Sequence, residues 1–130
     1  MSSSDVELPE VASVARDLIR FDTTNHGGGR AAGEREAAEY VGAYLERLGL
    51  TPEYYEPIPH RTNVMARVPG RDRSKPALVL HGHLDVVPAD AAEWSVHPFS
   101  GTVRDGYLWG RGAVDMKDMV GMILAVARHF

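Results

Sequence analysis

The chain has 130 residues, of which 44% are hydrophobic and 25% charged, and its formal net charge is −4. These values are ordinary for one soluble domain, and no block of like charge favours a nucleic-acid or membrane partner. The absence of cysteine excludes disulfides and thiolate ligands. Because no apolar stretch reaches the length of a span and the first residues lack a signal pattern, we expect a cytoplasmic protein.

Two helices are expected in the first fifty residues. Apolar side chains recur at helical spacing over residues 8–19, and Pro9 stands where only a first turn tolerates proline. Residues 22–33 include three consecutive glycines and have no periodicity, which indicates a loop. The second helix is expected to begin near Glu34, whose charge suits a helix N-terminus, and to end at Gly49.

Two strands are expected next. Residues 63–68 alternate between apolar and polar side chains, which predicts a strand that Pro69 stops. Residues 77–80 are continuously apolar, as is typical of a central strand covered on both faces. The predicted order of elements therefore points to an α/β fold, a three-layer sandwich around a mixed, mostly parallel sheet that is incomplete in this chain.

A hairpin and a helix complete the predicted elements. Asp105 and Gly106 favour a two-residue turn between strands at 102–104 and 107–109. The last helix is indicated by an apolar stripe at helical spacing. Its members are Met116, Met119, Val120, Ile123, Leu124 and Ala127. Because this stripe meets no stop signal before Phe130, we expect the natural chain to continue.

Two motifs carry the chemistry. His83 and Asp85 stand two residues apart after the apolar run, so both side chains can point the same way. Asp115 lies in a glycine-rich turn, with the sequence GRGAVDMK over residues 110–117, just before the last helix. A histidine and carboxylates brought together at the carboxyl end of a central strand suit metal-assisted hydrolysis.

These motifs resemble the H-x-D and G-R-G-x-x-D-M-K signatures of the dinuclear zinc metallopeptidases. This family includes aminoacylase, acetylornithine deacetylase, succinyl-diaminopimelate desuccinylase, carnosinase-type dipeptidases and glutamate carboxypeptidase. Weaker similarities, such as Asp22 to Asn25 and Asn63 with Val64, extend the resemblance from about residue 9 to the end. The resemblance implies a zinc-exopeptidase-like fold, of which residues 1–130 would be the N-terminal portion of the catalytic domain.

The resemblance also assigns roles to the motif residues. His83 would bind one metal and Asp115 would bridge two, while Asp85 would be the catalytic-site carboxylate that orients His83. The metals would be two Zn²⁺ ions in a complete site, with Co²⁺ or Mn²⁺ as alternatives for nitrogen and oxygen ligands. A cis peptide is implied after Asp115. Gly110 and Gly112 would let the chain approach the site closely.

Several parts of the family's site have no counterpart in this sequence. The chain has no adjacent Glu pair, which in the family supplies a general base and a ligand, and Asp118 is its only acidic residue after Asp115. The family's smaller dimerisation (lid) domain is also absent. We therefore expect residues 1–130 to be inactive alone and the full-length protein to be a possible homodimer.

Other interpretations of these residues stay open from the sequence alone. His83 could be a strand-end histidine bonded to a main-chain carbonyl, and Asp115 could be a helix N-cap. His81 shares the parity of His83 and could be an outer-shell partner. Asp118 and Lys117 are expected in a first helical turn, facing solvent or neighbouring loops. His97 and Trp94 could line the mouth of a pocket.

The function expected of the full-length protein is metal-dependent hydrolysis of an amide bond. The substrate would be a small peptide, cut at a bond near a free carboxylate, or an N-acyl amino acid. The alternative is a non-catalytic α/β module that binds a partner through an exposed sheet edge.

Overall fold

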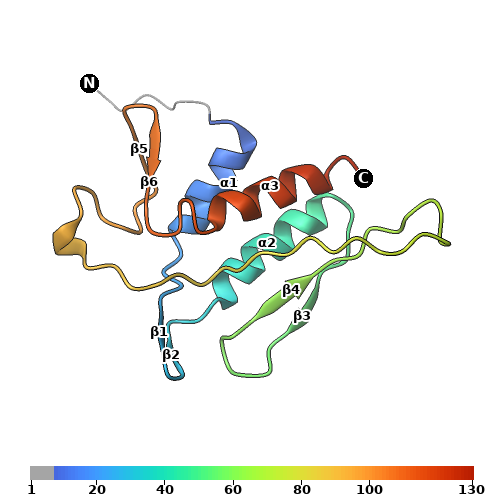
Figure 1. Ribbon diagram of the computed structural model, residues 1–130, viewed down its shortest axis with the longest axis horizontal. Helices are drawn as coiled ribbons and strands as arrows, with labels where there is room; N and C mark the ends of the chain where they lie inside the picture. The colour runs from blue at the N-terminus through green and yellow to red at the C-terminus, as the bar shows by residue number, and fades with distance from the viewer. Residues whose placement is uncertain (1–7) are drawn as a thin grey trace.

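The computed structural model describes residues 8–130, so the expectation of no signal segment, which concerns the first residues, lies outside the described range. Figure 1 shows the helices gathered centrally with hairpins around them. The chain is α/β, as predicted. Its elements are α1 (Glu10–Ile19), β1 (Asn25–Gly27), β2 (Arg30–Ala31), α2 (Arg35–Arg47), β3 (Glu53–Tyr55), β4 (Asn63–Met65), the 3-10 turn η1 (Ala91–Glu93), β5 (Thr102–Arg104), β6 (Tyr107–Trp109) and α3 (Lys117–Ala127).

The hydrophobic core lies between the three helices. The predicted apolar stripes of α1 and α2 face each other and α3, and burying them is the main favourable term for so small a unit. The core residues are Val14, Leu18, Ala37, Val41, Tyr44, Leu45, Val120 and Leu124. The stripe predicted for α3 is only partly buried, because Met119 is exposed. Among residues 8–130 no helix is long and apolar enough to cross a membrane.

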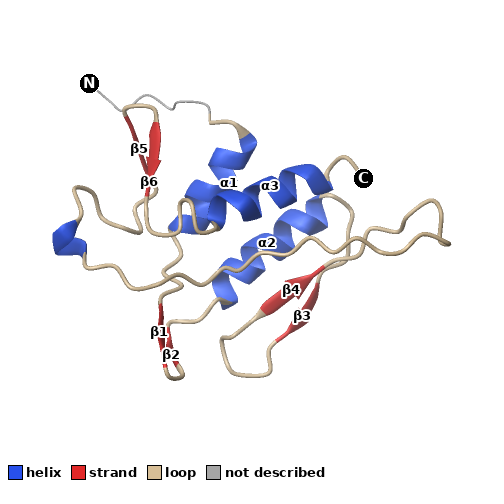
Figure 2. Cartoon of the chain, viewed as in Figure 1, coloured by secondary structure: helices blue, strands red, loops and turns tan. Residues whose placement is uncertain are grey.

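The strands form separate hairpins and not the predicted sandwich. Each of the three sheets among the described residues has two antiparallel strands, β1 with β2, β3 with β4 and β5 with β6 (Figure 2). A mostly parallel central sheet is therefore not seen. Within residues 8–130 the one parallel pairing is an isolated bridge between Thr24 and Val86, in which the Asn25 N–H donates to the Val86 carbonyl at 2.8 Å.

The strand predicted at 77–80 is extended chain without a ladder partner in the described range. Leu78, Val79 and Leu80 are 82, 75 and 52% exposed. An apolar run favours burial on both faces, but a strand also needs a neighbour, and in the described range β3 and β4 pair only with each other. Just beyond this run, Gly82 lies against Val120 of α3.

Of the three hairpins, only one was predicted. The β5–β6 turn has positive φ at both Asp105 (56°) and Gly106 (79°), which is the backbone that an Asp-Gly pair favours. Residues 22–33, expected to be a loop, contain the β1–β2 hairpin. Its tip is the glycine run 27–29, where φ is positive at every residue. The strand predicted over 63–68 is shorter, ending at Met65, and pairs with β3, which was missed.

Candidate metal centre

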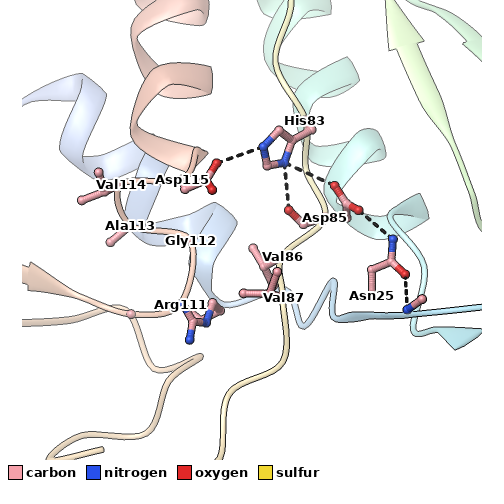
Figure 3. A pocket seen from close by; sticks show the side chains of 12 residues that line it. Asn25, His83, Asp85, Val86, Val87, Arg111, Gly112, Ala113, Val114 and Asp115 are labelled. Atoms are coloured by element: carbon pink, nitrogen blue, oxygen red, sulfur yellow. Dashed lines mark hydrogen bonds and ion pairs between the residues drawn. The ribbon is translucent and has the colours of Figure 1, made fainter.

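The predicted site residues line one cavity of about 490 Å³. Three segments meet there: β1, which begins at Asn25, the extended chain at 83–87, and the turn at 110–115 (Figure 3). The Thr24–Val86 bridge joins the first two segments, and the Thr23 hydroxyl donates to the Leu84 carbonyl at 2.6 Å. His83, Asp85 and Asp115 thus come together from distant parts of the sequence.

The imidazole of His83 is held at both nitrogens. Nδ1 lies 3.0 Å from the main-chain oxygen of Asp85 and 3.2 Å from its Oδ1. Nε2 lies 3.0 Å from Oδ1 of Asp115, across the cavity (Figure 3). Both partners of Nδ1 are oxygens that can only accept, and so is the Asp115 oxygen at Nε2. In the neutral tautomer that carries its proton on Nδ1, the lone pair is on Nε2 and faces Asp115.

That arrangement tests whether the residues suit a metal. The lone pair of Nε2 faces a carboxylate oxygen 3.0 Å away, and two acceptors at that distance need a cation between them, either a proton or a metal ion. Two ligands of one zinc, with bonds of about 2.1 Å, lie roughly 3 to 3.4 Å apart. The donor pair therefore fits a divalent ion. Within residues 8–130, however, no group of three such ligands is found.

Asp115 is presented by an unusual backbone. The Asp115–Met116 peptide is cis, as the resemblance implied, and the Asp115 carboxylate is 87% exposed at the cavity. Asp115 is not the N-cap of α3. That position belongs to Met116, and no side chain caps the helix there. The alternative capping role considered from the sequence is therefore wrong.

The glycines of the 110–115 turn meet neighbouring protein atoms. A Cβ on Gly110 would lie 2.4 Å from Ile19 Cγ2, and a Cβ on Gly112 would lie 2.7 Å from Val86 Cγ1. Gly112 also has a φ of +82°, which side chains rarely adopt. Glycine is required here because the turn packs against α1 and against the segment that carries His83.

Asp85 lies at the centre of a polar network. Its Oδ2 accepts from Nδ2 of Asn25 at 2.9 Å and lies 3.8 Å from the guanidinium of Arg61. Arg61 pairs in turn with the buried carboxylate of Glu34 at 3.0 Å. Burial raises the pKa of Glu34, while the Arg61 charge opposes that rise. The sequence offered a weak signal for Asn25, in the run 22–25, and none for Arg61.

Lys117 is buried, contrary to the expectation that it faces solvent or loops. Its side chain has no exposed area, and Nζ donates to the main-chain oxygens of Leu18 at 2.9 Å and Phe21 at 3.1 Å. Burial lowers the pKa of Lys117 to about 8, against the opposing effect of Asp22. The ammonium thereby satisfies carbonyls at the C-terminal end of α1, close to the turn that carries Asp115.

Three further candidates lie outside the cavity lining. His81 is exposed and does not line the cavity. His97 accepts a hydrogen bond from the Phe99 N–H, within its own loop. Trp94 lies under the guanidinium of Arg111, 5.4 Å from its ring centroid, and reaches the cavity only through that residue.

Comparison with known proteins shows that the chain is similar to several hydrolases. The chain is 39% identical over 127 residues to succinyl-diaminopimelate desuccinylase of Rhodospirillum centenum and 46% identical over 126 residues to that of Xanthobacter autotrophicus. It is 32% identical over 115 residues to N-formyl-4-amino-5-aminomethyl-2-methylpyrimidine deformylase of Halalkalibacterium halodurans. The relatives are hydrolases.

A second comparison matches the C-terminal part of the chain to a family model. The model of peptidase family M20/M25/M40 matches residues 79–130, which include His83, Asp85 and Asp115. The chain is related to this family, and the resemblance inferred from the two motifs is confirmed. The three relatives named above align with 94, 91 and 87% of this chain, which spans only 31, 30 and 26% of their length.

Proposed function

We propose that the full-length protein is a metal-dependent hydrolase that removes an acyl group from nitrogen. The observation that carries this proposal is the pair of His83 Nε2 and Asp115 Oδ1, 3.0 Å apart at a cavity, with Nδ1 of the same ring facing only oxygen acceptors. This pair is arranged to share a cation, and it lies within the segment that the peptidase family model matches.

His83 and Asp115 would hold the metal, and Asp85 would keep the His83 ring in the tautomer that leaves Nε2 free. When bound, a divalent metal supplies an activated water and polarises the scissile carbonyl. Zinc is the first choice, with Co²⁺ and Mn²⁺ as alternatives. A catalytic zinc normally has three protein ligands. In a protein of the relatives' length, further ligands and the general base would lie outside these 130 residues.

An N-acyl substrate is the better of the two substrate classes expected from the sequence. By their names, the relatives remove succinyl and formyl groups, and both classes of relative align with most of this chain. The cavity, at about 490 Å³, is of a size that suits a small molecule. The cytoplasmic location and a homodimer of the full-length protein stay predictions.

The test uses the full-length protein and a panel of N-succinyl and N-formyl compounds with a dipeptide. We expect hydrolysis of an N-acyl member that a chelator abolishes and added zinc restores. His83→Ala and Asp115→Asn should each lower kcat by at least about 100-fold, whereas His97→Ala, outside the cavity, should not. Hydrolysis that continues unchanged in the chelated protein or in both site variants would refute the proposal.

The second candidate is the non-catalytic module. Its supporting observation is the apolar extended segment 77–80, exposed and without a ladder partner in the described range. The same panel separates the two functions. A full-length protein that hydrolyses no member and binds no zinc would favour the module, because a hydrolase needs the His83–Asp115 pair whereas a docking segment does not.

A further inference from the structure

The Asp85 carboxylate is divided between two sets of partners (Figure 3). Oδ1 faces Nδ1 of His83 at 3.2 Å, while Oδ2 accepts from the side-chain amide of Asn25 at 2.9 Å. Arg61 lies on the Oδ2 side as well, at 3.8 Å. Because Asn25 and Arg61 engage Oδ2, Oδ1 is left to the imidazole.

Asn25 is itself fixed in the orientation that this contact needs. Its side-chain oxygen accepts from the Gly27 N–H at 2.9 Å, so its NH₂ group is the end that faces Asp85. Its main-chain N–H donates to the Val86 carbonyl at 2.8 Å, next to the parallel bridge. The residue that supplies the side-chain amide is therefore fixed by its own backbone hydrogen bond, which joins β1 to the segment that carries His83.

Arg61 interacts less closely with Asp85 than Asn25 does. Its guanidinium pairs with Glu34 at 3.0 Å and lies farther from Asp85, at 3.8 Å. One oxygen of Glu34, Oε1, is buried without a hydrogen-bond partner in the described residues, so the Glu34 carboxylate depends on Arg61 for its stabilisation. If the Asn25 amide were removed, the carboxylate of Asp85 would be free to turn towards this guanidinium and away from His83.

We propose that Asn25 is a positioning residue for the metal centre, which holds Asp85 so that Asp85 in turn holds the ring of His83. The inference rests on the proposed function, because it assigns Asn25 a part in metal binding. Asn25 does not touch the metal-binding atoms. It acts through Asp85, whose contact with Nδ1 fixes the tautomer and the direction of Nε2.

The variants are Asn25→Asp, Asn25→Ser and the matched control Asn63→Asp. Asn25→Asp keeps the acceptor for the Gly27 N–H and replaces the amide donor with a carboxylate that repels Asp85. Asn25→Ser loses the donor without adding charge, and serves if the first variant does not fold. Asn63 also uses its amide on an oxygen, that of Tyr55 at 3.3 Å, but in β4 and away from the cavity.

Zinc itself is the probe, with full-length protein that has been stripped of metal. We expect Asn25→Asp and Asn25→Ser to weaken zinc binding by about 10 to 100-fold in chelator competition, the range seen when outer-shell partners are lost. Asn63→Asp should bind as the wild type. In ¹⁵N spectra the His83 ring of the Asn25 variants should show a mixture of tautomers, which loss of stability alone would not produce.

A double-mutant cycle closes the argument. If Asn25 acts through Asp85, then Asn25→Ser should weaken zinc binding no further in an Asp85→Ala background. Additive losses, or Asn25 variants that bind zinc as the wild type does, would overturn the positioning role. That result is distinct from failure of the proposed function, which would appear as a wild-type protein whose zinc binding is absent or is unchanged in His83→Ala.

Discussion

At the scale of single residues, two side chains show how their surroundings determine what they can do. His83 is half exposed, yet both of its nitrogens face oxygens, so its ring is placed to share a cation with Asp115. Tyr40 is packed between Phe21 and Asp17, and its hydroxyl donates to Asp17 at 3.2 Å. Burial, followed by the Asp17 charge, raises the pKa of Tyr40 to about 12.

The Tyr40 pKa predicts a change of stability at alkaline pH. Between pH 10 and 12 the unfolded chain loses the Tyr40 proton while the folded chain keeps it, so this residue lowers the free energy of unfolding as pH rises through that window. Urea unfolding of Tyr40→Phe should lack that part of the decline. Tyr107→Phe, at an exposed site on β6, should follow the wild type. Parallel curves for the wild type and Tyr40→Phe across the window would contradict this origin.

Sequence patterns identified His83, Asp85 and Asp115, because each lies in a motif whose spacing has a geometric meaning. They did not identify Asn25 or place Lys117. An asparagine in a loop and a lysine at a helix start have many common uses, and only the folded chain shows that one meets Asp85 and the other the end of α1.

At the scale of elements, local signals predicted what local interactions form. The helices α1 and α2 and the β5–β6 hairpin lie where periodicity and turn residues placed them. The β3–β4 pairing was missed, because β3 has only three residues. It is a strand because it pairs with β4, and its own short sequence carries little signal of that pairing. The run 77–80 was wrongly assigned as a strand for the converse reason, since it has the composition without the neighbour.

A comparison of two glycines distinguishes the cost of a strained backbone from the cost of steric crowding. Gly106 and Gly112 have nearly equal φ values, +79° and +82°, but a Cβ on Gly106 meets nothing within 4 Å. Both alanine variants should lose the backbone term of about 1 kcal/mol. Gly112→Ala should lose about 1 to 3 kcal/mol more in urea unfolding, because its methyl group collides with Val86. Equal losses for the two variants would show that the turn moves freely away from the His83 segment.

At the scale of the whole molecule, the core between the helices is buried, whereas the apolar run at residues 77–80 is exposed to solvent. Leu78 and Val79 expose most of their surface, and other large apolar side chains, such as Ile58 and Tyr107, are exposed singly. The sequence predicted that the 77–80 segment is covered on both faces. In the described residues it is exposed, because an apolar run favours burial but does not specify a neighbouring segment that would provide it.

This open run predicts how the 130-residue chain behaves alone. We expect concentration-dependent self-association in sedimentation, because contiguous apolar surface and unpaired strand edges attract further copies. Leu78→Lys combined with Val79→Lys should shift the chain towards monomer. Ile58→Lys, which changes an isolated exposed residue, should have little effect. A wild-type chain that stays monomeric at every concentration would show that the segment is shielded in solution.

The ammonium of Lys117 bonds to the carbonyl of Leu18 across 99 positions of sequence. During synthesis α1 is translated long before Lys117, so the carbonyls at the end of α1 must bond to water until Lys117 has been added. We therefore expect the turn that carries Asp115 to pack against α1 only after Lys117 has been translated.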